Sequence, residues 1–292
     1  MRVALRIVAA SVRGARDSAP RLAELLAARN AGATFFLNLG PHRLARWLPG
    51  REVGGRARAG LARIRDAGFE IGLHGWDPVR WVARAAPGGD TWVERAMRRA
   101  CDVYEAILGE RPRAHAAPGW RMNRHAFRLT QRLGFHYGSD TLGRAPYIPM
   151  CEGELVACPQ LPTTLPTVEA LRARDGVALE AVHHEILRLS ADAPAGGHVF
   201  SVDADPGAAR VAPVLERLID GWHILGYEIC GLRALAESLD PKSLAHHVVA
   251  EAPLPGGGNA AAQGPVFLAG GDEVAPAGDS RNNAVAAAAG ER

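Results

Sequence analysis

Cysteine and lysine are both scarce in this chain. The four cysteines, Cys101, Cys151, Cys158 and Cys230, stand far apart, and none belongs to a CxxC pair or another metal-knuckle spacing. These spacings argue against a disulfide framework and a structural zinc site, so we expect four reduced thiols. Lys242 is the only lysine, and arginine therefore carries nearly all of the positive charge.

Long apolar runs are also missing. The segment Met1 to Ala10 begins with apolar residues, but Arg6 interrupts it and no small-residue cleavage site follows. We therefore predict a buried strand there rather than a signal peptide. No window has the length of apolar sequence that a membrane-spanning helix requires. We expect a cytoplasmic protein that does not cross a bilayer, and contact with a membrane surface stays open.

A strong charge of one sign is likewise absent, because 34 basic and 31 acidic residues leave a formal net charge of +3. A protein that binds nucleic acid gathers its basic residues into a patch or run, often with aromatic residues between them. Here the arginines are spread along the chain. The densest stretch, Arg43 to Arg65, alternates Arg with Ala, Gly and Leu, which is typical of the solvated face of a helix. We predict no nucleic-acid partner.

The sequence does contain a regular alternation of short apolar runs and longer amphipathic stretches, which is typical of strand-helix units around a parallel sheet. The predicted strands are Val3–Ala9, Ala33–Leu39, Phe69–Leu73, Ala114–Ala117, Phe135–Gly138, Leu155–Cys158, His198–Val202 and Tyr227–Ile229. We predict an α/β fold, a distorted (β/α) barrel with seven or eight parallel strands, and the alternative is an open doubly wound sheet. No GxGxxG follows the first strand, and no Walker, HExxH or GxSxG motif occurs.

The composition changes near residue 240. From Ala252 onward the chain consists mostly of Ala, Gly, Pro and Asn, with one short apolar stretch at Val266 to Leu268. A segment of this kind buries too little surface to offset its ordering entropy. We predict one barrel over residues 1–240, followed by a linker and a disordered tail over 241–292.

Polar and aromatic residues follow the predicted strands, at the end where a (β/α) barrel carries its reactive groups. Four strings contain most of them: GLHGWD (Gly72–Asp77), AAPGWR (Ala116–Arg121), YGSD (Tyr137–Asp140) and QLPTTLPT (Gln160–Thr167). In this order and spacing they resemble the polysaccharide deacetylase (NodB-homology) superfamily. Within it, the likeness is to the branch of deformylases that act on a lipid-linked formamido-arabinose in lipid A modification. The resemblance covers residues 3–239.

The resemblance implies a barrel that hydrolyses an N-acyl group from an amino sugar with a divalent metal. One Asp and two His hold the metal, a second Asp is the base, and a late His is the acid. This sequence departs from that pattern. Val8 and Ala10 stand where the two aspartates are expected. Pro78 replaces the second metal histidine, and Asp203 stands at the position of the catalytic histidine. Of the implied metal ligands, only His74 is present.

Several residues of the implied pocket remain as candidates for substrate binding. Trp76 and Trp120 either stack on a sugar ring or simply roof the barrel. Arg121 is a candidate to clamp a phosphate, and Arg13 either contacts a phosphate or forms a structural ion pair. The other candidates for substrate binding are His74, Ser139 and Asp140, which either orient the pocket or hydrogen-bond locally.

Asp203 and Asp77 are the candidates for catalysis. One imidazole does not hold a divalent ion, so we expect no cofactor from His74 alone. Zinc or manganese would bind only if His74, Asp77, Asp140 and Asp203 converge to rebuild a site.

Three functions follow from these residues. The first is a pseudoenzyme that still binds an amino sugar or a lipid-linked sugar phosphate, with peripheral contact at the inner membrane. The second is an active hydrolase that removes formyl or acetyl through a rebuilt site. The third is unrelated chemistry in the same barrel.

Overall fold

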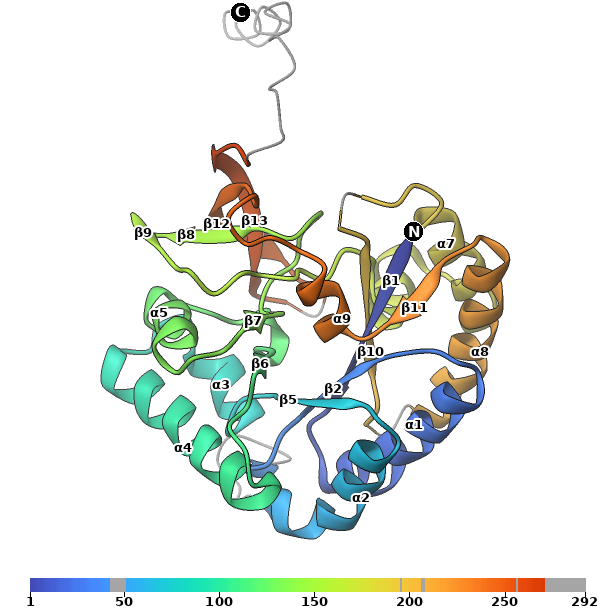
Figure 1. Cartoon of the computed structure of the whole chain (residues 1–292), viewed down its shortest axis with the longest axis horizontal. Helices are drawn as coiled ribbons and strands as arrows, with labels where there is room; N and C mark the ends of the chain where they lie inside the picture. Colours follow the sequence, from blue (N-terminus) through green and yellow to red (C-terminus); the bar gives the residue numbers. More distant parts are fainter. Residues whose placement is uncertain (43–50, 195, 206–207, 256, 271–292) are drawn as a thin grey trace, which may run out of the picture.

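A curled parallel sheet forms the centre of the molecule in the computed structural model, which describes residues 1–42, 51–194, 196–205, 208–255 and 257–270 (Figure 1). The strand order is β10 (His198–Asp203), β1 (Arg2–Ala9), β2 (Thr34–Leu37), β5 (Glu70–Leu73), β6 (Ala114–His115) and β7 (Tyr137–Gly138). A seventh strand, β11 (Glu228–Cys230), pairs with the first residues of β1. All of these pairings are parallel, as the predicted barrel requires.

Strand β1 shows how the sequence builds this centre. Successive side chains of a strand point to opposite faces. Val3, Leu5 and Ile7 belong to the large hydrophobic core that includes residues of the surrounding helices. Arg6 and Val8 alternate with them and line a cavity. A strand buried on both faces reads as a nearly continuous apolar run, which is why β1 was recognisable from sequence.

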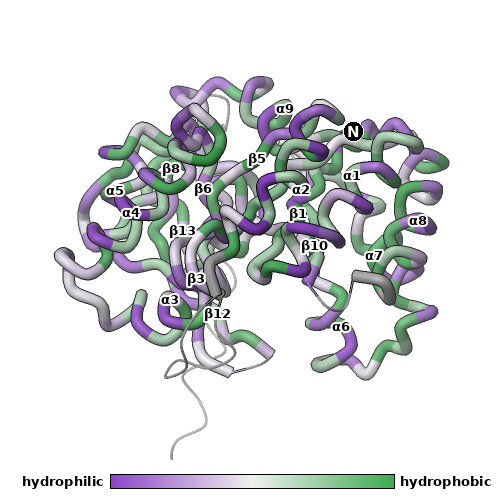
Figure 2. Tube along the Cα trace, turned by 90° about the horizontal axis from the view of Figure 1, so that it is seen from below, coloured by the Kyte–Doolittle hydropathy of each residue, from purple (hydrophilic) through white to green (hydrophobic). Residues whose placement is uncertain are grey.

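Helices cover the outside of the sheet. They are α1 (Ala19–Ala28), α2 (Gly54–Asp66), α4 (Asp90–Leu108), α5 (Arg124–Arg132), α7 (Val182–Leu189) and α8 (Ala208–Ile224). Figure 2 shows hydrophobic and hydrophilic residues alternating along them, as expected for helices with one buried face. In α2 the buried side is Ala57, Leu61 and Ile64, and Arg56 and Arg58 are exposed. The solvated-face interpretation of the arginine-rich stretch is thus confirmed for α2, while residues 43–50 lie outside the described residues.

A proline-rich segment, residues 159–166, fills the gap between β7 and β10. Leu161 N–H donates to Gly138 O at 2.8 Å, and Thr164 N–H donates to Val199 O at 3.0 Å. Pro159, Pro162 and Pro166 interrupt it, and proline has no N–H to donate. The segment therefore closes the barrel through isolated bridges rather than as a strand.

The strand predicted at Leu155–Cys158 was wrong. Instead, β8 (Ile148–Cys151) and β9 (Glu154–Leu155) form an antiparallel hairpin outside the barrel sheet. Short β3 (Pro41–His42) and β4 (Arg51–Glu52) pair with each other. Three short helices, α3 (Pro78–Arg84), α6 (Val168–Asp175) and α9 (Leu232–Glu237), and the single turns η1 (Gly14–Ser18), η2 (Pro118–Trp120) and η3 (Leu179–Ala181) complete the connections.

The predicted linker and disordered tail were wrong for residues 246–268. β12 (His246–Pro253) and β13 (Asn259–Leu268) form an antiparallel hairpin, and β12 pairs in parallel with β8. Small residues suit this place because Ala260, Ala261 and Ala262 are buried where the hairpin meets Leu142. Low hydrophobicity signalled disorder, whereas the backbone hydrogen bonds and close approach of alanines order this segment. Residues 271–292 lie outside the described residues.

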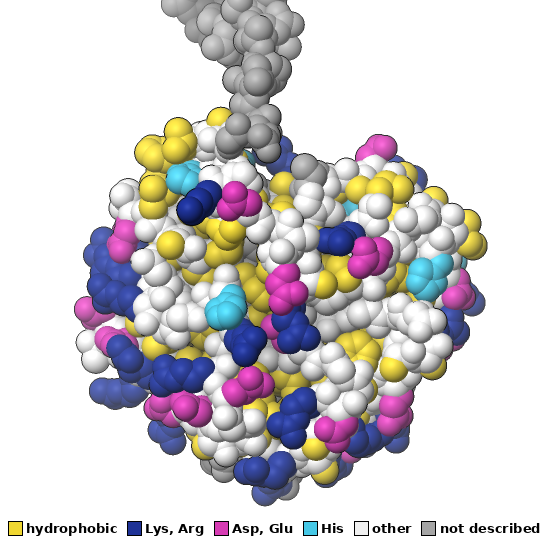
Figure 3. Space-filling view, in the orientation of Figure 1, with side chains coloured by type: hydrophobic (Ala, Val, Ile, Leu, Met, Phe, Trp, Pro, Cys, Tyr) yellow, Lys and Arg dark blue, Asp and Glu magenta, His cyan; other side chains and the backbone are white. Residues whose placement is uncertain are grey.

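The charges on the surface are mixed in sign, and the cysteines carry free thiols, as the sequence predicts. On the face seen in Figure 3, arginines are interspersed with aspartates and glutamates. The four cysteines are free and buried. Burial raises the pKa of the Cys158 thiol to about 12, so the neutral thiol is the form in the fold.

Candidate functional site

A cavity of about 300 Å³, here called the Arg6 cavity, opens at the carboxyl ends of β1 and β10. It is lined by Arg6, Val8 and Ala10 on one side and by Ser201 and Asp203 on another. His74, Trp120 and Glu169 complete the polar and aromatic wall. The carboxyl ends of barrel strands are where reactive groups gather, so the cavity lies at the end that the sequence predicts.

Arg6 is the cation at the base of this cavity. Its side chain is only 2% exposed, and Nη1 donates to Ser201 Oγ at 2.8 Å. The guanidinium lies 5.2 Å from the ring of Trp120 and 5.6 Å from that of Phe36. Burial lowers the pKa of Arg6 to about 10, against the opposing charges of Asp140 and Asp203. Arg6 therefore remains charged at neutral pH.

Trp120 forms the aromatic wall. It follows Gly119, and both residues have positive φ angles, 61° at Gly119 and 52° at Trp120. Glycine adopts that conformation freely, whereas tryptophan does so at a cost that surrounding contacts must offset. One such contact is the hydrogen bond from Trp120 Nε1 to Thr163 Oγ1 at 3.1 Å. The strained backbone turns the indole toward the cavity.

His74 is a neutral imidazole in the wall. It is 5% exposed, and its Nδ1 lies 2.8 Å from Ala116 O, so Nδ1 carries the proton and donates to that carbonyl. Burial, with a further contribution from the charge of Arg6, lowers the pKa of His74 to about 3. The imidazole is thus uncharged at neutral pH.

Three carboxylates stand at the mouth. Asp205 accepts hydrogen bonds from the N–H groups of Ala10 and Ser11 at 2.9 and 3.0 Å, which fixes the turn after β1. Asp203 accepts from Asp205 N–H at 2.8 Å, and Glu169 is exposed. Asp203 reaches solvent at the rim but is otherwise enclosed by protein. That burial raises its pKa to about 6, with smaller contributions from the charges of Asp205 and Glu169.

A second cavity of about 330 Å³, here called the tryptophan groove, shares the β5–α3 loop with the first. Trp76 and Asp77 both line this groove and do not line the Arg6 cavity. The guanidinium of Arg99 lies 4.7 Å from the Trp76 ring. Asp77 begins α3, accepts from Arg80 N–H at 3.2 Å, and lies 3.8 Å from the Arg80 guanidinium. Asp77 therefore serves as the N-cap of α3.

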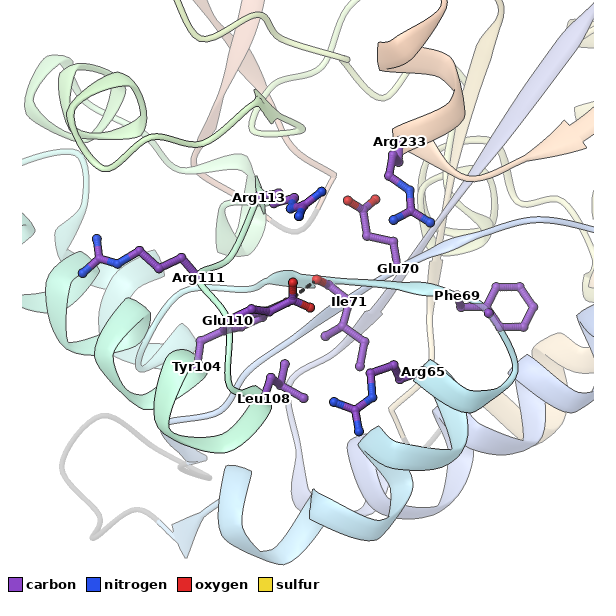
Figure 4. A pocket seen from close by; sticks show the side chains of 11 residues that line it. Arg65, Phe69, Glu70, Ile71, Tyr104, Leu108, Glu110, Arg111, Arg113 and Arg233 are labelled. Atoms are coloured by element: carbon purple, nitrogen blue, oxygen red, sulfur yellow. Dashed lines mark hydrogen bonds between the residues drawn. The ribbon is translucent and has the colours of Figure 1, made fainter.

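A third cavity, of about 240 Å³, lies at the opposite, amino end of β5. Figure 4 shows the Glu70 carboxylate between Arg113 and Arg233. Glu70 also accepts from Thr34 and Tyr137, at 2.9 and 2.5 Å. Burial raises the pKa of Glu70. Groups at this end of a barrel serve stability, so we assign the cavity no function.

Comparisons with known proteins identify similar sequences and similar folds. The sequence profile of the family described as Polysaccharide deacetylase matches residues 13–138. A Shewanella sediminis protein named as a probable 4-deoxy-4-formamido-L-arabinose-phosphoundecaprenol deformylase, ArnD, is 26% identical over 250 residues, which cover 75% of this chain and 80% of that protein. A Wigglesworthia glossinidia brevipalpis protein of the same name is 24% identical, over 53% of this chain and 66% of its own length.

Solved structures share the fold. A Mycobacterium smegmatis protein assigned to the polysaccharide deacetylases superposes with a TM-score of 0.62 at 18% identity, covering 86% of this chain and 95% of its own. A protein described as a CE4 family pseudoenzyme from Bacillus anthracis superposes with a TM-score of 0.53 at 15% identity, covering 85% of this chain and 69% of its own.

Residues 13–138 therefore match the polysaccharide deacetylase family, and the fold resembles that of solved structures described as polysaccharide deacetylases. The sequence relatives lie in the ArnD-like branch, as the motifs predicted.

The divalent metal that this superfamily implies does not fit the Arg6 cavity. His74 is the one family ligand present, while the side chains of Val8 and Ala10 offer no donor atom. Within the described ranges no group of three or more His, Cys, Asp or Glu side chains can hold a metal ion. The buried guanidinium of Arg6 would also repel a dication. No step of a reaction is therefore assigned to a metal here.

The hypothesis of a rebuilt metal site was wrong, because its four members do not converge. Asp77 lies in the tryptophan groove. Asp140 is fully buried and accepts from His115 Nδ1 at 2.7 Å, from Ala117 N–H at 2.8 Å, and from Gln160 Nε2 at 3.1 Å. Only His74 and Asp203 remain together in the Arg6 cavity.

The other sequence-predicted binding residues separate in the same way. Trp120 lines the Arg6 cavity, whereas Arg13 is exposed and lines neither cavity. Arg121 donates from Nη2 to Gly257 O at 3.2 Å and so holds the turn of the β12–β13 hairpin. Ser139 is fully buried and donates to Leu161 O at 2.9 Å, which is a structural contact of the closing segment.

Sequence reasoning missed Arg6 as a functional residue. Arg6 interrupts an apolar run in the sequence, and a charged residue inside a buried strand is costly unless it has a partner. Ser201 and Glu169 were also missed, because a hydroxyl and a carboxylate at those positions carry no sequence pattern of their own.

Proposed function

We propose that this chain is a catalytically degenerate polysaccharide deacetylase that binds an N-acylated amino sugar in the Arg6 cavity without hydrolysing it. The observation that carries this proposal is the apolar wall that Val8 and Ala10 present at the end of β1. Amide hydrolysis needs a polarised carbonyl, an activated water and a proton donor for the leaving amine.

The groups that remain supply little of that chemistry. His74, with a pKa near 3, is a poor base and is not a proton donor of matched strength at neutral pH. Asp203, with a pKa near 6, can accept a proton but has no metal-bound water to act on. Each missing general acid or base is worth about 10²- to 10⁴-fold in rate. Binding can survive the loss of these groups, whereas turnover at an enzymatic rate cannot.

Two features of the site favour a sugar phosphate as the ligand. The indole of Trp120 offers the flat apolar surface that suits the C–H face of a sugar ring. The tryptophan groove carries Arg80, Arg95 and Arg99. One guanidinium group can bind two phosphate oxygens through two parallel hydrogen bonds. The curated relatives are named for a substrate that joins formamido-arabinose to phosphoundecaprenol. We therefore infer a lipid-linked amino-sugar phosphate, of the class used in lipid A modification.

A lipid-linked ligand would bring the protein to the inner membrane surface from the cytoplasmic side. Among the helices that the structure describes, none has the length and apolar character to cross a membrane. The tryptophan groove combines indole rings with arginines, and these residue types suit a lipid–water boundary with anionic headgroups. We propose peripheral contact through this face.

The proposal is tested by calorimetric titration of a short-chain lipid phosphate carrying a formamido sugar, with formate release followed in the same samples. We expect saturable binding and no formate above the buffer rate. Trp120→Ala should abolish binding and Trp120→Phe should retain part of it, because phenylalanine keeps a ring face. Repeated turnover, or unchanged binding by Trp120→Ala, would contradict the proposal.

A second candidate is an active, metal-independent hydrolase in which Asp203 is the base, and its raised pKa favours this role. It predicts release of formate or acetate that Asp203→Asn abolishes. A solved structure of similar fold is relevant to the first candidate. It is described as a mutant of a CE4 family pseudoenzyme with restored enzymatic activity.

A further inference from the structure

We propose that the Arg6 cavity is a carboxylate-binding site in which the buried guanidinium of Arg6 supplies the positive charge. The proposal rests on the proposed function only in taking this cavity as the ligand site. It adds a second chemical class that the cavity accepts, a single carboxylate on a small molecule or on a sugar, which the formamido sugar itself does not carry.

The first step concerns the isolation of the guanidinium. Arg6 is 2% exposed, and its one side-chain hydrogen bond in the described part of the chain goes to the neutral hydroxyl of Ser201. Its Nε–H has no hydrogen-bond partner among the described residues. A buried charge is normally paired and fully hydrogen-bonded, since an unpaired one costs several kcal/mol.

The second step is that the surrounding acids do not pair directly with Arg6. Val8, the next residue on the same face of β1, and Ala10, just past the end of the strand, carry no acid. Asp140 is occupied by His115, Ala117 and Gln160. The negative charge of Asp203 stabilises the Arg6 cation through space. The carboxylate of Asp203 accepts a hydrogen bond from Asp205 N–H.

The third step is the shape of the cationic group. The rings of Phe36 and Trp120 lie within 6 Å of the guanidinium. Ser201 occupies Nη1. The remaining Nε and Nη2 edge of an arginine is the fork that matches the two oxygens of a carboxylate. Val8 and Ala10 would contact the carbon side of such a ligand.

The fourth step selects a single negative charge. Glu169, Asp203 and Asp205 stand at the mouth of the cavity. Both ligands face these three acids, but a carboxylate brings one negative charge and a phosphate dianion brings two, so the phosphate is repelled more strongly. A carboxylate is therefore favoured over a phosphate at Arg6. The phosphate of a lipid-linked ligand belongs instead to the arginines of the tryptophan groove.

The carboxylate has two sources, a free small acid such as formate or acetate, or the acid group of a uronic sugar. The position of Trp120 beside Arg6 separates them, because a ring stacked on the indole strengthens only the second. Glucuronate binding more tightly than acetate would indicate the sugar acid, and equal affinities would indicate the small acid.

The experiment is a titration of the full chain with acetate, glucuronate, glucose and inorganic phosphate at constant ionic strength, read by calorimetry. We expect at least one carboxylate to bind and Arg6→Met to weaken it roughly 10- to 100-fold, the range for a hydrogen bond to a charged group. The matched control Arg21→Met, at an exposed arginine of α1, should leave the affinity unchanged. Unaltered carboxylate binding by a folded Arg6→Met, or tighter binding of phosphate that needs Arg6, would overturn the proposal.

A second readout covers the case in which Arg6→Met does not fold. The arginine Nε–H resonance of wild-type Arg6, assigned by its loss in Arg6→Lys, should shift when acetate or glucuronate is added. No shift at saturating ligand would overturn the proposal. Carboxylate binding without binding of the formamido-sugar lipid phosphate would leave this inference standing and reject the proposed function, and the opposite pattern would reject this inference alone.

Discussion

Asp140 Oδ1 and His115 Nδ1 lie 2.7 Å apart, and both side chains are completely excluded from solvent. The pair joins the ends of β6 and β7, and Gln160 attaches the proline-rich closing segment to the same carboxylate. Asp140, which the sequence suggested as a substrate-binding residue, therefore holds β6, β7 and the closing segment together.

Replacing Asp140 should be strongly destabilising. Asp140→Ala leaves His115, Ala117 N–H and Gln160 without their acceptor, and removing one member of such a buried set costs about 3–5 kcal/mol. Urea unfolding followed by circular dichroism measures the change. Asp17→Ala is the control, because Asp17 pairs with Arg16 at the surface and should cost less than about 1 kcal/mol. Similar losses for both variants would contradict the structural role of Asp140.

Asp203 should make stability depend on pH. Its folded-state pKa, about 6, lies above the ordinary aspartate value of 3.8, so folding favours the protonated carboxyl. Stability from this group is greatest below about pH 4 and falls as the pH rises through 6. Asp203→Asn should therefore be more stable than wild type at pH 7, with a difference that shrinks toward pH 4. Melting temperatures across this range test the sign, and a constant difference would argue against the raised pKa.

Adding carboxylates beside His74 should create metal affinity. Val8, Ala10 and His74 line one cavity, so Val8→Asp with Ala10→Asp would place two oxygen ligands next to an imidazole and offset the charge of Arg6. We expect this double variant to retain stoichiometric zinc or manganese after dialysis. Val8→Asn with Ala10→Asn keeps the size without the charge and should retain none. If the wild type retains as much metal as the double variant, the wild-type cavity does not lack metal ligands and the prediction is contradicted.

Gly258 should be the sensitive position of the hairpin turn. Both Gly257 and Gly258 have positive φ angles, but only a Cβ at Gly258 would approach another group, at 2.0 Å from Arg121 Nη2. Gly257→Ala should cost about 1 kcal/mol for the backbone strain alone. Gly258→Ala should cost more, because Arg121 must also move. Equal costs in denaturant unfolding would show that Arg121 does not hold the turn.

The sequence predicted the barrel well because its strands are buried on both faces and its helices on one. It did not predict the β12–β13 hairpin, since Ala260 to Ala262 are ordered by backbone pairing and close approach rather than by large apolar side chains. Of the candidate site, Trp120, His74 and Asp203 do meet in one cavity. Asp77 and Arg121 do not line this cavity, because Asp77 caps helix α3 and Arg121 donates a hydrogen bond to the turn of the β12–β13 hairpin.

The closing segment also determines which part of the wall can separate most easily. Among the described residues, the backbone bonds from this segment to β10 all reach Val199, at 3.0 and 3.3 Å. The later residues of β10, Ser201 and Asp203, line the Arg6 cavity beyond that point. Amide protons along this seam should exchange with solvent before those of β1 and β2.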